Sequence, residues 1–259
     1  MGEILADPLR RAYAVKDAQK QALLIERAAA MGLALGGEAA RRLSAYQALL
    51  EDWNTRVNLT GNASFDALLD MHLMDSLTPL TVNGLLPDGA AVIDVGSGAG
   101  LPGIPLAVLR PDLKITLLDS LGKRVKFLEA AIGALELKNV TAVHARAEDA
   151  AHDARYRERF DIALARAVAA LPVLLELLLP FVRTGGKAVA YKGPSVEDEL
   201  TAGKRAAFLL GGGPPEAIGV SALPLAEHRH CLVVNEKRVN TPGQYPRKAG
   251  TPGKNPLGI

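Results

Sequence analysis

A short apolar run followed by closely spaced glycines is the feature that most constrains the fold of this chain. Residues 91–95 (AVIDV) are predicted to form a buried strand, and three glycines at alternate positions, Gly96, Gly98 and Gly100, follow it. A helix is expected over 104–109. Glycines let the backbone turn sharply and approach a ligand closely, and the amides at a helix N-terminus point toward the same place. The stretch therefore predicts a strand–loop–helix unit that holds a nucleotide-like cofactor.

Two classes of cofactor fit this loop. Gly98, Gly100 and Gly103 satisfy G-x-G-x-x-G, the fingerprint of dinucleotide-binding proteins. Asp94 with Gly96, Gly98 and Gly100 satisfies D-x-G-x-G-x-G, which is typical of S-adenosylmethionine (SAM) methyltransferases. An acid near the end of the strand can bind the ammonium group of a methionine moiety, whereas it would repel a pyrophosphate. The loop favours SAM over NAD modestly, and a purely structural glycine turn is the third alternative.

Strands and helices alternate along most of the chain, after a helical N-terminal region. Helices are expected at 19–31, 38–53 and 65–72, and a turn at 87–89 introduces the first strand. Such alternation is typical of an α/β fold, in which helices cover both faces of a mostly parallel sheet. The expected strands are 91–95, 114–118, 140–144, 162–165, 188–191, 217–220 and 231–234, and the later helices are 104–109, 123–135, 169–181 and 197–209.

Composition divides the chain into three parts. Residues 1–83 are predicted to form the helical region, residues 84–236 the cofactor-binding domain, and residues 237–259 a basic, flexible tail. The net charge of the whole chain, +2, is too small to indicate a nucleic-acid partner by itself, so the distribution of charge matters more. The tail is the one segment whose charges are strongly of one sign. Binding to phosphate groups is its natural role, and a tail without a target is the alternative. Its charged residues are Lys237, Arg238, Arg247, Lys248 and Lys254, with no acid among them.

The sequence gives no sign of a membrane or an oxidising compartment. The longest apolar run, 162–182, contains Arg166, Glu176 and two prolines, so it is not a membrane span. The N-terminus lacks the apolar segment of a signal peptide. Cys231 is the only cysteine and lies in an apolar run, which indicates a buried core position and excludes an internal disulfide. We expect a cytoplasmic protein.

Polar residues follow three further strands, at the edge of the sheet where ligands bind in such folds. Asp119 ends the second strand, where an acid can accept the ribose hydroxyls of an adenosine or, alternatively, cap the next helix. Ala147 and Glu148 follow the third strand and either read an adenine edge or form a solvated turn. Arg166 ends the fourth strand, where a structural salt bridge and a contact with cofactor or substrate are equally plausible.

Missing motifs narrow the chemistry. Methyltransferases that act on an exocyclic base nitrogen often carry Asn/Asp-Pro-Pro-aromatic after the fourth strand, but residues 166–169 are RAVA. Methylation at carbon five of a pyrimidine needs a nucleophilic cysteine, and Cys231 is unsuitably placed. A target atom with a free lone pair, such as N7 of guanine, would need no base. His228 and His230 have no carboxylate or cysteine at ligand spacing, so no metal is expected.

Several blocks, in the same order, give the chain a resemblance to a known family. It resembles the bacterial small-subunit ribosomal RNA methyltransferase G family, formerly called glucose-inhibited division protein B. The resemblance runs from about residue 43 to 234. The blocks are WNTRVNLT (53–60), HLMDSL (72–77), residues 94–107, LLDSLGKRVKFL (117–128), Ala147-Glu148, residues 160–169 and GGKAVAYKG (185–193).

The resemblance implies a class I SAM-dependent methyltransferase, with a Rossmann-like, mostly parallel seven-stranded sheet and a small N-terminal helical region. It implies transfer of a methyl group to N7 of guanine 527 (conventional 16S rRNA numbering), in a hairpin loop near the decoding site. Ala145 departs from the family, many of whose members have glycine there. The implied cofactor contacts are Gly96, Leu101, Asp119, Ser120, Leu121, Ala147, Glu148 and Arg166, of which Leu101, Ser120 and Leu121 rest on the resemblance alone.

The implied partner is 16S rRNA or the small ribosomal subunit. The protein is expected to be a monomer and not to associate with a membrane. Four residues of the first two blocks have no obvious core role and are expected to frame the substrate side of the pocket: Arg56, Asn58, His72 and Asp75. A methyltransferase for another substrate, an NAD(P)-dependent enzyme and a non-catalytic RNA-binding module are the alternatives. The hypothetical RNA-binding residues are Arg56, Asn58, His72, Lys192, Arg247, Lys248 and Lys254.

Overall fold

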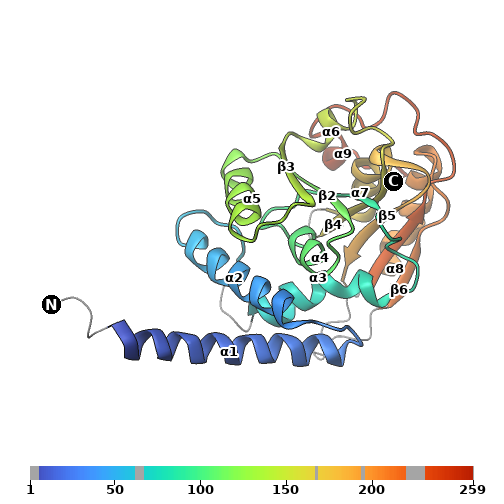
Figure 1. Cartoon of the computed structure of the whole chain (residues 1–259). Coiled ribbons are helices and arrows are strands. Elements are labelled where there is room, and N and C mark those ends of the chain that lie inside the picture. Colours follow the sequence, from blue (N-terminus) through green and yellow to red (C-terminus); the bar gives the residue numbers. More distant parts are fainter. Residues whose placement is uncertain (1–5, 62–66, 167–168, 194–195, 220–230, 259) are drawn as a thin grey trace.

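A seven-stranded sheet forms the centre of the molecule (Figure 1). The computed structural model describes residues 6–61, 67–166, 169–193, 196–219 and 231–258. The strand order is β3-β2-β1-β4-β5-β7-β6; β7 runs antiparallel to both of its neighbours and the other pairs are parallel. This confirms the predicted mostly parallel sheet. The strands are β1 (Ala91–Val95), β2 (Lys114–Asp119), β3 (Val140–His144), β4 (Phe160–Arg166), β5 (Val182–Lys192), β6 (Glu216–Gly219) and β7 (Cys231–Glu236).

Helices cover both faces of the sheet because the side chains of each strand alternate between two cores. In β1, Val92 belongs to the same core as Phe127 of α5, and Ile93 to the same core as Leu174 of α7. The strand is buried on both faces, as its continuous apolar run predicted. The helices of this part are α4 (Gly103–Leu109), α5 (Gly122–Ala134), α6 (Ala147–Ala150), α7 (Leu171–Leu178) with its 3-10 extension η3 (Leu179–Phe181), α8 (Val196–Leu209) and α9 (Thr251–Lys254).

The N-terminal region is helical, and its first helix is longer than predicted. A helix predicted from residue 19 begins at Ala6 instead, and Figure 1 shows its N-terminal part extending away from the body. In α2, Leu43, Tyr46 and Leu50 recur at helical spacing and form an apolar stripe that is buried. The described part of the predicted helix 65–72 is a π-helix, and residues 65 and 66 lie outside the described residues. The elements are α1 (Ala6–Ala30), α2 (Gly37–Asn54), η1 (Ala67–Met74), α3 (Asp75–Leu77) and η2 (Thr78–Thr81).

The fifth strand is longer than the predicted range 188–191 and contains a pair of glycines. β5 starts at Val182 and continues through Gly185 and Gly186. Gly185 has a φ of +82°, and its amide donates to the carbonyl of Lys237 at 2.8 Å, so the irregular backbone remains hydrogen-bonded. The pair therefore accommodates an irregularity inside a longer strand. Val220, the last residue of another predicted strand, lies outside the described residues.

Residues 237–258 are folded onto the body, which corrects the expectation of a flexible tail. Lys237 is fully buried; its ammonium donates to the Leu179 carbonyl at 2.7 Å and pairs with Glu158 at 3.3 Å. Arg247 forms an ion pair at 2.6 Å with Glu176, whose side chain is fully buried. Lys237 and Arg247 thus neutralise one partly buried and one fully buried acid of the body, a role that charge counting along the chain cannot detect.

Within the described ranges, no helix is long and apolar enough to cross a membrane.

Candidate functional site

Two adjoining cavities open at the carboxyl ends of the parallel strands. The larger cavity has a volume of about 470 Å³ and the smaller one about 150 Å³. Gly96, Asp119 and Ser120 line both, so Asp119 lies where the two cavities meet. The larger cavity is also lined by Leu59, Thr60, Gly61, His72, Ser97, Gly98, Ala99, Leu101, Arg124 and Arg166. The smaller is completed by Val95, Leu118, Ala145, Arg146, Ala147, Glu148 and Leu177.

The glycine loop turns sharply, as its sequence predicts, through backbone conformations that glycine adopts without strain. Gly96, Gly98 and Gly100 have φ values of +73°, +58° and +85°, a region that side chains disfavour. A Cβ at Gly100 would also collide with the side chain of Ile104, and one at Gly103 would collide with Leu117. The loop is therefore pressed against the start of α4, and its glycines are required by close packing as well as by conformation.

Asp94 is fully buried beneath this loop and is not part of either cavity wall. Its Oδ2 accepts a hydrogen bond from the Gly103 amide at 3.0 Å, while its buried Oδ1 has no partner among the described residues. Burial raises the pKa of this carboxyl to about 7. A buried carboxylate with an unused acceptor suits a cationic ligand group above the loop, such as the ammonium of a methionine moiety.

Asp119 organises the junction of the two cavities. Its Oδ2 accepts from the Gly98 amide at 2.9 Å and its Oδ1 from the Leu121 amide at 2.8 Å. It does not cap α5, because the N-cap position belongs to Leu121. Each carboxylate oxygen can accept a second hydrogen bond, so Asp119 retains capacity for ribose hydroxyls. The side chain of Leu121 is about half exposed (52%) and lines neither cavity.

The smaller cavity holds the other predicted cofactor residues, Ala147 and Glu148, at the start of α6. Oε1 of Glu148 accepts a hydrogen bond from the amide of Gly250 at 3.1 Å. The C-terminal segment thus reaches the candidate site, a contact across 102 residues that no local pattern could indicate.

Arg166 satisfies both interpretations of its sequence position. Its Nη1 donates to Oδ2 of Asp75 at 3.0 Å, and its Nη2 donates to Nδ1 of His72 at 3.1 Å. It also lines the larger cavity with His72. Burial and the charge of Arg166 lower the pKa of His72 to about 4. Asp75 was expected to frame the substrate, but it is nearly fully buried and positions Arg166 instead.

Sequence reasoning missed several residues of the site, and Tyr46 and Arg124 are the most informative of them. The hydroxyl of Tyr46 donates to the Ala99 carbonyl at 2.5 Å, which joins α2 to the glycine loop. Tyr46 lies at helical spacing from Leu43 and Leu50 of α2, a pattern that indicates only a core position. Arg124 lies in the larger cavity wall, 3.7 Å from Asp119. Its place two residues into the helix after Asp119 was the available signal.

The hypothetical RNA-binding residues are dispersed. Arg56 and Asn58 are exposed, and Arg56 pairs with Asp52 and lies over the Trp53 ring. His72 is the member of the set that lines the larger cavity.

The remaining basic members divide into paired and exposed residues. Lys192 pairs with Glu199 at 2.8 Å, and Arg247 is committed to Glu176. Lys248 and Lys254 are exposed.

Metal chemistry finds no support in the part of the chain that the structure describes. No group of three or more His, Cys, Asp or Glu residues is placed there to hold an ion. His228 and His230 lie outside those residues.

Comparisons with known proteins agree on one family. The model described as rRNA small subunit methyltransferase G matches residues 39–221. The ribosomal RNA small subunit methyltransferase G of Acetivibrio thermocellus is 43% identical, over 93% of this chain and 98% of its own length. Its counterpart in Desulfitobacterium hafniense is 44% identical over 88% and 93%. The crystal structure of a predicted O-methyltransferase from Agrobacterium tumefaciens aligns with a TM-score of 0.50 at 16% identity, over 63% of this chain and 80% of that one, a likeness of fold alone.

Proposed function

The chain belongs to the rRNA small subunit methyltransferase G family, and from this premise we propose that it methylates N7 of guanine 527 in 16S rRNA. Membership makes it a SAM-dependent methyltransferase of small-subunit rRNA, with the class I fold. This removes the NAD(P) alternative that the glycine loop left open. The choice of N7, the position of the guanine and the roles of individual residues are the proposal.

The observation that carries the proposal is the pair of cavities divided at Asp119. SAM consists of an adenine, a ribose and a methionine end that carries an ammonium group. Its site needs, in that order, a slot for the adenine ring, an acceptor for the ribose hydroxyls and a negative charge near the ammonium. The smaller cavity with Ala147 and Glu148 supplies the slot for adenine. Asp119 lies between, at the place of the ribose. The glycine loop above Asp94 supplies the place for the methionine end.

The larger cavity has room beyond the glycine loop for the target base. Its far wall contains His72, Arg166 and residues 59–61. The cofactor, when bound, supplies an electrophilic methyl group on a sulfonium. N7 of guanine carries a lone pair and no proton, so the chain has only to hold that atom in line with the methyl carbon. Proximity and alignment then account for most of the catalysis.

The RNA outside the cavity is proposed to contact the exposed basic residues. Lys248 and Lys254 are available for phosphate groups, whereas Arg247 already serves Glu176. We place the RNA-facing side of the cavity in residues 1–83, because Leu59, Thr60 and His72 line it. The protein is proposed to act as a cytoplasmic monomer.

Methyl transfer from radiolabelled SAM tests the proposal. Small subunits from a strain lacking the enzyme, and free 16S rRNA in parallel, are the substrates, and N7-methylguanine-specific strand cleavage maps the product. We expect one cleavage site, at guanine 527. Label at another atom or nucleotide would keep the methyltransferase and overturn the proposed target. The substrate that reacts faster shows how much of the particle is recognised.

A further inference from the structure

One histidine in the wall of the larger cavity is held by a side chain that can only donate hydrogen bonds. His72 lies in η1, and its Nδ1 is 3.1 Å from Nη2 of Arg166. Asp75 fixes the other side of the guanidinium at 3.0 Å. Arginine has no acceptor, so Nδ1 of His72 must accept this hydrogen bond. Nδ1 is therefore unprotonated.

The neutral ring then carries its one hydrogen on Nε2. Burial and the neighbouring positive charge of Arg166 keep the pKa of His72 near 4, so the ring is neutral at pH 7. Within the described residues, Nε2 has no hydrogen-bond partner. The lining of the larger cavity thus includes the Nε2–H of His72, a donor of fixed tautomer, beside the place that the target base is proposed to occupy.

Guanine and adenine differ at the atom next to N7. Guanine presents the O6 acceptor beside N7, while adenine presents the N6 amino donor. A fixed N–H donor matches O6 and opposes N6. It cannot be used on N7 itself, because that lone pair must attack the methyl carbon.

We propose that Nε2–H of His72 donates a hydrogen bond to O6 of the target guanine, and thereby both orients N7 and selects guanine over adenine. This inference rests on the proposed function. In the reaction the N7–C bond forms as the S–C bond breaks, and the positive charge passes from sulfur to the base. No proton moves, so His72 acts as a positioning and specificity residue and not as a base.

Charge in the cavity supports a neutral histidine in this place. The Arg166 charge is balanced by Asp75 in a nearly fully buried pair. A protonated His72 would place an uncompensated cation beside a base that becomes cationic, which would raise the barrier. Arg166 therefore has two effects on His72: it fixes the tautomer and it disfavours the charged ring.

Two variants test the roles of the two ring nitrogens of His72 independently. His72→Asn keeps an acceptor near Nδ1, so Arg166 stays paired, but it loses the donor at Nε2. His72→Gln places an amide N–H near the position of Nε2. The substrates are small subunits reconstituted with 16S rRNA that carries either guanine or 2-aminopurine, which lacks O6, at the target position. SAM affinity, measured for each variant, reports on the fold and the cofactor site.

Single-turnover methylation of the guanine and 2-aminopurine substrates by the wild type and by His72→Asn gives the four rates of a double-mutant cycle, and His72→Gln is measured beside it on both substrates. We expect the wild type to lose about ten- to a hundredfold in rate when O6 is removed. His72→Asn should be slower on guanine by a similar factor, insensitive to the loss of O6 and unchanged in SAM affinity. His72→Gln should restore part of the rate and of the sensitivity to O6. Intrinsic differences between the two bases cancel in the cycle.

The outcomes keep the two proposals apart. Penalties that multiply, so that His72→Asn is as sensitive to O6 as the wild type, would overturn the role of His72 while leaving the proposed function intact. A wild type that does not methylate N7 of the guanine substrate would overturn the proposed function, and this inference with it.

Discussion

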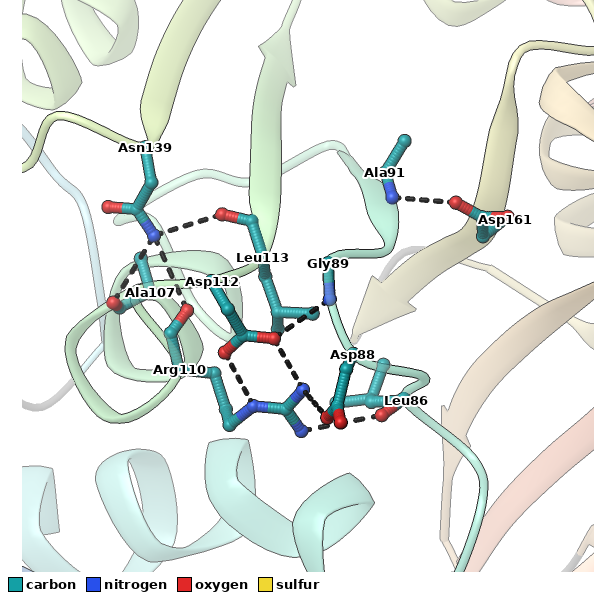
Figure 2. Close-up of polar contacts among 10 residues, drawn as sticks. All are labelled: Leu86, Asp88, Gly89, Ala91, Ala107, Arg110, Asp112, Leu113, Asn139 and Asp161. Carbon is teal, nitrogen blue, oxygen red and sulfur yellow. Dashed lines mark hydrogen bonds and ion pairs between the residues drawn. The ribbon is translucent and has the colours of Figure 1, made fainter.

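The two ends of the parallel strands are built on opposite principles. At the amino end, charged and polar groups satisfy one another (Figure 2). The guanidinium of Arg110 donates to both oxygens of Asp112, at 2.8 and 2.7 Å, and to Asp88 at 2.9 Å. The Asn139 amide donates to three carbonyls, and the Ala91 amide donates to Asp161 at 2.7 Å. These groups are paired before any ligand arrives.

At the carboxyl end, polar groups are held in place but left with capacity. Oδ1 of Asp94 and Nε2 of His72 have no partners among the described residues, and Asp119 is held by two backbone amides without using all its acceptor sites. Such groups cost stability when a site is empty and bind when it is filled. The difference teaches that one end of the sheet stabilises the fold while the other is reserved for ligands.

The sharpest test of this difference substitutes glycines of positive φ at the two ends. Gly100→Ala should lower SAM affinity about a hundredfold, because backbone strain adds to a collision with Ile104. Gly89→Ala, at the amino end, meets no atom within 4 Å despite its φ of +68°, so it should cost about 1 kcal/mol of stability and leave SAM affinity unchanged. Calorimetric titration and thermal unfolding measure both quantities. Equal effects on affinity would break the comparison.

Two aspartates provide a matched pair of smaller effect. Asp119→Ala should weaken SAM binding by about 1–3 kcal/mol, since hydrogen bonds to a charged acceptor are lost. Asp112→Ala should lower stability and leave SAM binding unchanged, because the polar contacts of Asp112 among the described residues are with Arg110 and Gly89. Calorimetry on both variants decides the matter, and an unchanged affinity in Asp119→Ala would remove that residue from the site.

Acidification should also affect the two ends differently. Asp94 titrates at about 7 in the folded protein, above the usual value of 3.8, so the unliganded protein gains stability as the pH falls from about 7 to about 4. SAM affinity should change in the opposite direction, by at most about tenfold per pH unit below 7, because an ammonium favours the ionised carboxyl. Asp94→Asn should abolish this dependence.

At the amino end the sign of the linkage is reversed. The hydrogen bond from Arg110 holds the pKa of Asp112 well below its usual range. Its contribution to stability is therefore complete above about pH 4 and is lost only in stronger acid.

The pH dependence of SAM affinity tests the role given to Asp94. A wild-type SAM affinity that stays constant between pH 5 and 8 would contradict that role.

The smallest effect is expected from Arg110→Ala. Its ion pairs are partly exposed, so we expect a loss of about 1 kcal/mol and a fall of about 2–4 °C in the unfolding temperature. SAM affinity and methylation rate should stay at the wild-type values. A measurable loss of SAM affinity would show that the amino end is coupled to the site.

Local sequence was sufficient to predict that certain residues lie at the carboxyl edge of the sheet, where they line the larger cavity. Gly96, Asp119 and Arg166 were found because each comes directly after a buried apolar run, and parallel strands bring such positions to one edge. The partners of these residues were not predictable. The Arg166–His72 contact spans 94 residues, and the Glu148–Gly250 contact spans 102.

The folded C-terminal segment was missed for the same reason. Lys237 and Arg247 gave a basic, proline-rich pattern that is typical of a flexible tail. Their partners, the partly buried Glu158 and the fully buried Glu176, lie elsewhere in the chain, and only folding brings them together.

Hydrogen exchange with and without SAM tests most directly whether the carboxyl end alone receives the cofactor. We predict SAM-dependent protection of amides in 96–104, 119–124 and 145–150, and no change in 86–91 and 110–114. Protection of the amino-end segments, or none at 119–124, would contradict the assignment of the two ends.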